Sequence, residues 1–456
     1  MRSSRPTARN GRSGRGADSL GEVSTEQGAG RVAGPVVAGI GSRFIFWCAL
    51  ALAVVGLLAA CAVRPPGGTA QPAPTGTAAE ASTGTPPAAG ATAPTTTSAA
   101  AAATTPTTVA KPKPRTVTIL GSGDVLIHPE LWEQAQADAK SEGESGIDFG
   151  PMYASIAPDV RRAQVAICEM ESPLAPPDGP FTGWPNFSSP PQVLTALTAV
   201  GYNVCTTASN HSIDEGYEGV VRTLGELDAA GIKHTGSARS AKEAATPLMV
   251  TTESGVKVAM LAYSFGFNGN QLPADQPWLA NETDVPTILA AAHRAKKAGA
   301  DIVVLSMHWG IEYEHDATAE QQDEANALLA SPDIDLILGD HTHVVQPAQK
   351  INGKWVFYGM GNQISRHADP IPEGRQGIMP MVTFTETASG KFKVSDAEAI
   401  ATWMQDTPAL RLIDIHLALA DPATSPAKRA EFQTAHDAIV KYLDGYGATA
   451  HGLRVI

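Results

Sequence analysis

From Arg115 onward, apolar and polar positions follow two different patterns along the chain. Short apolar runs that end in glycine or a polar residue predict strands over 116–124, 164–170, 202–210, 256–264, 301–310, 333–340, 354–362 and 379–387. Longer stretches with apolar residues at helical spacing predict helices over 151–163, 190–201, 216–231, 285–299 and 318–330. Strands and helices that alternate in this way are typical of an α/β or layered α-β-α domain. We place this domain at 115–405, followed by a mainly helical extension at 406–456.

The first 61 residues have a pattern of a different kind. An arginine-rich polar segment over 1–43 precedes an uncharged run from Phe44 to Cys61. This run is short for a transmembrane helix but suits the core of a signal peptide. Its last four residues, Leu-Ala-Ala-Cys, resemble the bacterial lipobox, so we expect Cys61 to be lipidated. The alternative is an uncleaved signal anchor, and either would hold the protein outside the cytoplasmic membrane.

Residues 62–114 form a tract of Thr, Ala, Pro and Gly with almost no large aliphatic side chains. Such a tract cannot bury a core, and we expect a disordered linker that carries the domain away from the membrane.

Charge and cysteine content narrow the classes of function. The net charge of -13 argues against a nucleic-acid surface. It does not exclude anionic substrates, because a bound cation would supply positive charge locally. The chain has no Cys-x-x-Cys pair. Cys168 and Cys205 lie in predicted strands, which favours two buried thiols, with a disulfide as the alternative.

Polar residues able to bind metal follow one predicted strand after another. They are Asp124 and His128 after the first strand, Glu169 and Glu171 after the second, Asn210, His211 and Asp214 after the third, His308 and Glu312 after the fifth, and Asp340, His341 and His343 after the sixth. Singly, each could be a turn former or a helix cap. Together they predict a metal site, because open α/β sheets bind ligands at the carboxyl ends of their strands. In the sixth strand, Gly339 is expected to let the chain turn away.

The residue types indicate the kind of metal. Carboxylates, an amide oxygen and imidazoles suit one or two divalent cations such as Mn²⁺. Two ions that share a carboxylate can activate water for attack on phosphorus, and a nearby histidine can protonate the leaving group.

Six motifs in order carry a family resemblance: GDVLIH, CEMESPL, ASNHSIDEGYEG, SMHWGIEYE, LGDHTHVVQP and YGMGNQ. Over about Val117 to Thr385 the chain resembles the capsule-synthesis protein CapA family, which is implicated in poly-γ-glutamate capsule assembly. The resemblance implies a layered α-β-β-α fold like that of calcineurin-type metallophosphoesterases, with the metal site at the strand ends.

The resemblance also implies roles for individual residues. Asp124 and His343 would bind a first ion. Asn210, His308 and His341 would bind a second, and Glu171 would bridge the two. His211 would be the general acid and Asp214 would orient it.

The sequence departs from the pattern at the first ion. Leu126 stands where the phosphoesterases have a histidine, and His128 could substitute for it. Glu169 stands where many relatives have asparagine. Further residues that could contribute are Glu312, Asp340 and Asn362.

The function expected from these features is synthesis or tethering of an envelope polymer by an exported, anchored protein. Its partners would be the membrane and an anionic polymer or its synthase, and no nucleic acid. Metal-dependent phosphoesterase-like hydrolysis is one form of this activity. A non-catalytic polymer-binding or synthase-assembly factor is the alternative. A secreted nucleotidase is disfavoured, since no separate substrate domain is visible.

Overall fold

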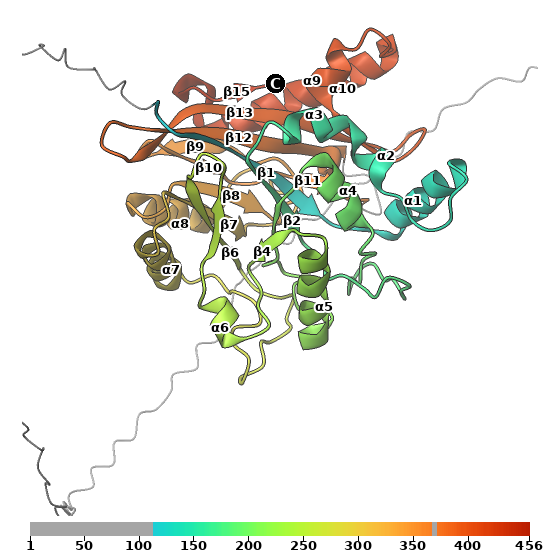
Figure 1. The fold of residues 1–456 in the computed structure, drawn as a ribbon. Coiled ribbons are helices and arrows are strands. Elements are labelled where there is room, and N and C mark those ends of the chain that lie inside the picture. The colour runs from blue at the N-terminus through green and yellow to red at the C-terminus, as the bar shows by residue number, and fades with distance from the viewer. Residues whose placement is uncertain (1–112, 367–371) are drawn as a thin grey trace, which may run out of the picture. The chain divides into compact units, whose positions relative to one another are not determined.

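Two β-sheets form the centre of the protein in the computed structural model, which describes residues 113–366 and 372–456 (Figure 1). The first sheet has the strand order β14-β13-β12-β1-β2-β3-β4, with β11 paired to β1 and β15 paired to β13. The second has the order β5-β6-β7-β8-β10-β9. Within them β1, β2 and β3 run parallel to one another, and so do β6, β7 and β8. Each sheet therefore gathers the carboxyl ends of three central strands at one edge.

The bounds of the elements are as follows. The strands are β1 (Thr116–Val125), β2 (Val165–Met170), β3 (Val204–Thr206), β4 (Lys233–Thr235), β5 (Leu248–Thr251), β6 (Lys257–Ser264), β7 (Ile302–His308), β8 (Leu336–Asp340), β9 (Ala348–Ile351), β10 (Lys354–Phe357), β11 (Asn362–Ile364), β12 (Gln376–Glu386), β13 (Phe392–Gln405), β14 (Arg411–Asp414) and β15 (Arg454–Val455). The α-helices are α1 (Pro129–Ser141), α2 (Gly150–Tyr153), α3 (Ala157–Val160), α4 (Val193–Val200), α5 (Gly216–Ala229), α6 (Ala241–Ala244), α7 (Val285–Lys297), α8 (Ala319–Ala330), α9 (Ile415–Ala420) and α10 (Pro426–Leu443). Short 3₁₀ turns are η1 (Ala154–Ile156), η2 (Pro372–Arg375), η3 (Asp444–Tyr446) and η4 (Thr449–His451).

Three hydrophobic cores separate four layers. One core lies between the two sheets and also includes buried residues of α9 and α10. A second joins the first sheet to α1–α5, and a third joins the second sheet to α7 and α8. In β1, for example, Ile119 belongs to the core between the sheets and its neighbour Leu120 belongs to the core under the helices. Strands with both faces buried read as continuous apolar runs, which is why they stand out in the sequence. The predicted layered α-β-β-α fold is confirmed.

Several elements differ from the sequence-based expectation. The helix expected over 151–163 is broken into α2, η1 and α3, with prolines in the first turns of both helices. The longest described strand, β13, was not predicted: exposed and half-buried positions alternate over its first half, which is the pattern of a strand with one face towards solvent, whereas the predicted strands were mainly apolar runs. From residue 406 onward the chain forms β14, α9, α10 and β15, and both of these strands pair with β13.

The predicted signal segment, lipobox cysteine Cys61 and most of the predicted linker lie outside the described residues. Among residues 113–366 and 372–456, none of the helices has the length and apolar content needed to cross a membrane.

Cys168 and Cys205 are joined by a disulfide between β2 and β3. The two residues are directly opposite each other in the parallel register, with Cα atoms 4.5 Å apart. The pairing follows the alternative that the sequence left open, and it depends on a strand register that the sequence does not reveal.

Candidate metal centre

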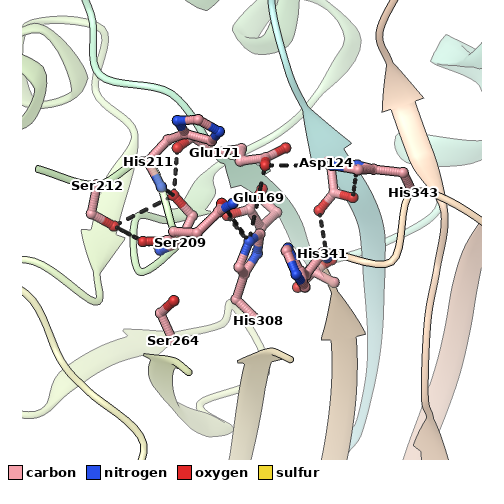
Figure 2. A network of polar contacts seen from close by, with 12 residues as sticks. Asp124, Glu169, Glu171, Ser209, His211, Ser212, Ser264, His308, His341 and His343 are labelled. Atoms are coloured by element: carbon pink, nitrogen blue, oxygen red, sulfur yellow. Dashed lines mark hydrogen bonds and ion pairs between the residues drawn. The ribbon is translucent and has the colours of Figure 1, made fainter. Parts of the chain in front are cut away.

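The carboxyl ends of strands from both sheets meet at one cluster of buried side chains (Figure 2). Asp124 comes from β1, Glu169 and Glu171 from β2 and the residue just beyond it, and Asn210 and His211 from the loop after β3. His308 ends β7, and His341 and His343 follow β8. Every one of these side chains is buried. Residues predicted as metal ligands from separate strands are thus brought together.

Asp124 and His343 form the first part of the cluster. Asp124 Oδ1 accepts a hydrogen bond from the backbone N–H of His341 at 3.1 Å, and Oδ2 lies 3.0 Å from His343 Nδ1. The same nitrogen lies 3.0 Å from Asn362 Oδ1. Because both of these neighbours are acceptors, Nδ1 carries a proton, and Nε2 is the nitrogen that can face a metal. Burial alone would lower the pKa of His343, but Glu171 and Asp124 raise it to about 9, so an ion at Nε2 would take the place of a proton.

Glu171 lies between the two groups of predicted ligands. Its Oε1 atom is 3.8 Å from His343 Nε2 and 3.9 Å from His308 Nε2. The side chain is fully buried, and neither carboxylate oxygen has a hydrogen-bond partner. Ser209 holds the backbone of Glu171 by donating its hydroxyl to the carbonyl oxygen. This position is the one that a bridging carboxylate needs.

His308, Asn210 and His341 form the second part. His308 Nε2 lies 3.0 Å from Asn210 Oδ1, and its Nδ1 lies 3.8 Å from Glu169 Oε1. The rings of His308 and His341 are 4.8 Å apart, and His341 Nδ1 has no hydrogen-bond partner. The exposed ring of Phe265 covers His341 at 4.5 Å.

The ionisation of the side chains in the cluster indicates whether they suit a metal ion. Burial, with Asp124 nearby, raises the pKa values of Glu169 and Glu171 well above their usual range. Burial lowers the pKa of His308 well below its usual value and that of His341 to about 3, so both rings are neutral. Buried carboxylates without partners are costly, and neutral imidazoles are the form that binds metal. The residues present therefore fit a divalent cation and form a candidate metal site.

Three sets of ligand atoms lie within 4.8 Å of one another at this edge: Asp124, Glu169 and His308; Asp124, Glu171 and His343; and Glu312, His341 and His343. Glu169, which departs from the family pattern, thus belongs to a candidate set, and both of its oxygens lack hydrogen-bond partners.

His211 and Asp214 form a hydrogen-bonded pair beside the cluster. His211 Nδ1 lies 2.6 Å from Asp214 Oδ2, which also accepts the backbone N–H of Phe187 at 2.9 Å. The ring of Phe187 packs edge-on against His211 at 4.8 Å. The imidazole is therefore fixed by a carboxylate on one nitrogen and by an aromatic ring on its side.

A cavity of about 360 Å³ opens beside the cluster. Its lining includes Leu126, His128, Trp184, Phe187, His211, Asn268, Glu312, Tyr313 and His343. His211 and His343 therefore line the same cavity, so that the predicted general acid and one of the predicted metal ligands face one space.

Two predicted residues have roles other than close coordination. His128 lines the cavity, but its Nδ1 lies 3.1 Å from both the Leu126 carbonyl and the Arg366 N–H. Asp340 Oδ2 accepts the hydroxyl of Ser306 at 3.0 Å. Neither residue belongs to a three-ligand set within the described part of the chain.

Three contributors were missed by sequence reasoning. Asn268 accepts a hydrogen bond from Asn210 Nδ2 at 3.2 Å, Phe265 covers His341, and Tyr313 lies 5.9 Å from His343, ring to ring. Phe265 and Asn268 come from the loop after β6, which contains none of the six family motifs, so no pattern marked them. Tyr313 follows the predicted Glu312, but its aromatic ring gave no metal-ligand signal of its own.

The loop after β8 has an unusual backbone. His341 and His343 have φ angles of 89° and 56°, in the left-handed region that residues with side chains rarely adopt. The expected turn at Gly339 is wrong, because β8 continues through Gly339 to Asp340. A Cβ atom at Gly339 would collide with the backbone carbonyl of Tyr358 and with the indole nitrogen of Trp309. Glycine is needed there for close approach, and the turn occurs at the two histidines.

Comparison with known proteins agrees with the motifs. The chain is 33% identical over 211 residues to the PGA biosynthesis protein CapA of Bacillus subtilis (strain 168), covering 44% of this chain and 52% of that protein. It is 28% identical over 180 residues to the capsule biosynthesis protein CapA of Bacillus anthracis, covering 39% and 43%. The chain thus spans about half the length of the curated relatives it matches.

Among solved structures, the calcineurin-like phosphoesterase YfkN from Bacillus subtilis is similar over 72% of this chain and 99% of that chain, with a TM-score of 0.39 and 16% identity. The 5'-nucleotidase precursor from Thermus thermophilus is similar over 72% and 59%, with a TM-score of 0.40 and 14% identity. The family model for the bacterial capsule synthesis protein PGA_cap matches residues 118–367, more than half of the chain, and the chain belongs to this family.

Proposed function

We propose that the protein acts outside the cytoplasmic membrane in the synthesis or tethering of a poly-glutamate-type envelope polymer, as a metal-dependent hydrolase or transferase. The observation that carries the catalytic part is the fully buried Glu171, whose oxygens lack partners midway between His308 and His343. Family membership and the relatives named for PGA and capsule biosynthesis support the polymer.

The ligands would be shared between two positions. Asp124 and His343 would hold one ion, Asn210, His308 and His341 would hold a second, and Glu171 would contact both. When bound, Mn²⁺ or a similar ion would polarise a phosphoester or amide oxygen and increase the acidity of water.

The chain's own residues would complete the reaction. His211 would donate a proton from Nε2 to the leaving group, because Nδ1 is held by Asp214. Asp214 would keep this tautomer and stabilise the charged imidazole. Phe187 would restrict rotation of the ring and exclude water from one side.

The location is part of the same proposal. A lipid anchor at Cys61, or a signal anchor ending there, would attach the protein to the membrane, and residues 62–114 would separate the domain from it. The chemistry of the 58–61 sequence supports the anchor. Mass spectrometry of the protein purified from membranes should find a mature N-terminus at Cys61 carrying lipid, and an unmodified Cys61 within an uncleaved chain would support the signal anchor instead.

A non-catalytic assembly factor is the second candidate. It is favoured by Leu126, an apolar side chain that occupies the position of a histidine ligand in the phosphoesterases and lines the cavity. A first ion would then have fewer ligands and be held weakly.

Turnover of aryl phosphodiesters and monoesters with Mn²⁺ separates the two candidates. If the protein is an enzyme, turnover should depend on the metal and should be lost in His211→Ala. No turnover at any metal loading, together with His211→Ala cells that produce normal envelope polymer, would exclude the enzyme and favour the assembly factor.

A further inference from the structure

A second group of potential ligands lies apart from the candidate metal centre. It consists of Asp159 in α3, Asp414 at the end of β14 and His416 in the first turn of α9. One ligand atom from each lies within 4.8 Å of the others. His416 Nδ1 is 2.8 Å from Asp414 Oδ1 and 3.6 Å from Asp159 Oδ2. Two segments that are far apart in the sequence, α3 and the junction of β14 with α9, thus present two carboxylates and an imidazole to one point.

Both carboxylates are buried and only half satisfied. The exposed fraction is 5% for Asp159 and 0% for Asp414. Asp159 Oδ1 accepts from Arg162 at 2.6 Å, and Asp414 Oδ1 caps α9 by accepting the Leu417 N–H at 3.2 Å. The Oδ2 atom of each carboxylate accepts no hydrogen bond from a donor group, and the two carboxyl groups lie within hydrogen-bonding reach of each other. Buried carboxylate oxygens are rarely left in this state, because desolvation without a partner is costly.

Two carboxylate oxygens can be satisfied together in only two ways. Either one carboxyl keeps a proton and donates it to the other, or a cation lies between them. His416 favours the bound cation over the shared proton. A proton shared by the two carboxyl groups needs no imidazole, whereas two carboxylates and an imidazole are a common ligand set for a transition metal.

We propose that Asp159, Asp414 and His416 form a second, structural site for a divalent transition-metal ion such as Zn²⁺, with water completing the coordination. In a tetrahedral zinc site with bonds of about 2.0–2.1 Å, ligand atoms lie about 3.3 Å apart. The two measured distances from His416 Nδ1, 2.8 and 3.6 Å, lie on either side of this value. The His416 side chain is 33% exposed, which gives the ion a route from solvent.

Arg162 reduces the negative charge of the site. Arg162 contacts Asp159 through one nitrogen and Glu398 through the other at 2.5 Å, so it neutralises part of the acidic group without occupying either Oδ2 atom. Asp414 and His416 lie outside residues 118–367, the part that matches the family. A bound ion would connect α3 to β14 and α9, and would fasten the C-terminal segment to the matched domain.

Metal counting in a protein that lacks the candidate metal centre tests the site. We would replace His308 and His343 by Ala in the full-length chain, because together they remove a ligand from each of the three sets at the candidate metal centre. The protein would then be dialysed against Zn²⁺ and its metal content measured by mass spectrometry. About one equivalent should remain, and adding His416→Ala should remove it. The matched control is His293→Ala, since His293 is also exposed and lies 2.9 Å from an aspartate, Asp333. The control should keep the ion.

Thermal unfolding gives a second readout. Zn²⁺ should raise the melting temperature of the His308→Ala/His343→Ala protein, EDTA should reverse the effect, and His416→Ala should abolish it. No bound ion in that protein would show that Asp159 and Asp414 share a proton and would overturn the proposal. An ion that persists after both His416→Ala and Asp159→Asn would overturn it as well. If the double variant does not fold, the wild type should bind one more ion than His416→Ala, and equal counts would decide against the site.

Discussion

His211 and Asp214 are joined by a hydrogen bond of 2.6 Å between Nδ1 and Oδ2, three residues apart in one loop. This pairing leaves Nε2, which lies 3.4 Å from the amide nitrogen of Asn268, as the nitrogen that can face a substrate in the cavity. An imidazole that is fixed in one tautomer by a carboxylate is the arrangement that proton transfer requires. The pair links the buried metal ligands to the cavity beside them.

Replacing Asp214 by Asn should lower kcat about 10- to 100-fold with little change in KM. The amide can present its NH₂ group to His211 and favour the wrong tautomer, while the metal ligands stay intact. Steady-state kinetics on an aryl phosphodiester, together with metal analysis, checks this. Glu218→Gln, an exposed change in nearby α5, is the control and should behave as wild type. A loss of bound metal in Asp214→Asn would contradict the role assigned here.

Glu171→Gln should have opposite effects on metal binding and on the stability of the metal-free protein. Gln should raise the melting temperature in EDTA, because burial without partners disfavours the ionised carboxyl of Glu171 and raises its pKa, a cost that an amide does not carry. Metal affinity should fall, since a ligand to both ions is lost. Thermal unfolding with EDTA and with Mn²⁺ measures both effects. The exposed Glu253→Gln should change neither. A destabilised, metal-binding Glu171→Gln protein would refute the bridging position.

His128 should make the protein sensitive to acid. Burial lowers the pKa of His128 to about 4, below its ordinary value of 6.5. The folded state therefore binds fewer protons than the unfolded state below pH 6.5, and stability falls as the pH is lowered from 6.5 towards 4. The loss should be about 2 kcal/mol between pH 7.5 and pH 5. In urea unfolding, the free energy of unfolding of His128→Gln should fall less between pH 7.5 and pH 5 than that of the wild type, by this amount.

The exposed His293→Gln serves as the control for that experiment and should keep the acid sensitivity of the wild type. Parallel pH profiles for wild type and His128→Gln would show that His128 is not the responsible group.

The disulfide between Cys168 and Cys205 should contribute about 4 kcal/mol to the free energy of unfolding, because it closes a loop over a sequence separation of 37 residues. Unfolding and refolding in the presence of a phosphine reductant should lower stability by this amount. The Cys168→Ala/Cys205→Ala protein should not respond to the reductant. Alkylation of both cysteines in the unreduced, denatured wild type would show that the thiols are free.

The strand-end residues could be predicted because both faces of the central strands are buried. Each strand is then a mainly apolar run, and Asp124 or His308 is the first ionisable residue in it. The resemblance to the family indicated which of these residues would share an ion. The structure brings these residues together, as the shared edge of the sheet required.

The sequence could not reveal relationships that depend on register and on loop shape. Pairing of Cys168 with Cys205 follows from their opposition in β2 and β3. The hydrogen bond between Asn268 and Asn210 connects residues 58 positions apart through an irregular loop. Gly339 reads as a turn residue but is needed for contact with Trp309 and Tyr358. In each case a spatial neighbour, absent from the local pattern, determines the role.

The division of the ligands between the two sheets has a consequence for dynamics. Asp124 and Glu171 come from the first sheet, whereas His308, His341 and His343 come from the second. An ion held by both groups would act as a crosslink between the two sheets. Its release should therefore weaken the packing of one sheet on the other before the strands within either sheet separate. Amide hydrogen exchange should then accelerate first at the ends of β1 and β8, where the backbone N–H of His341 donates to Asp124.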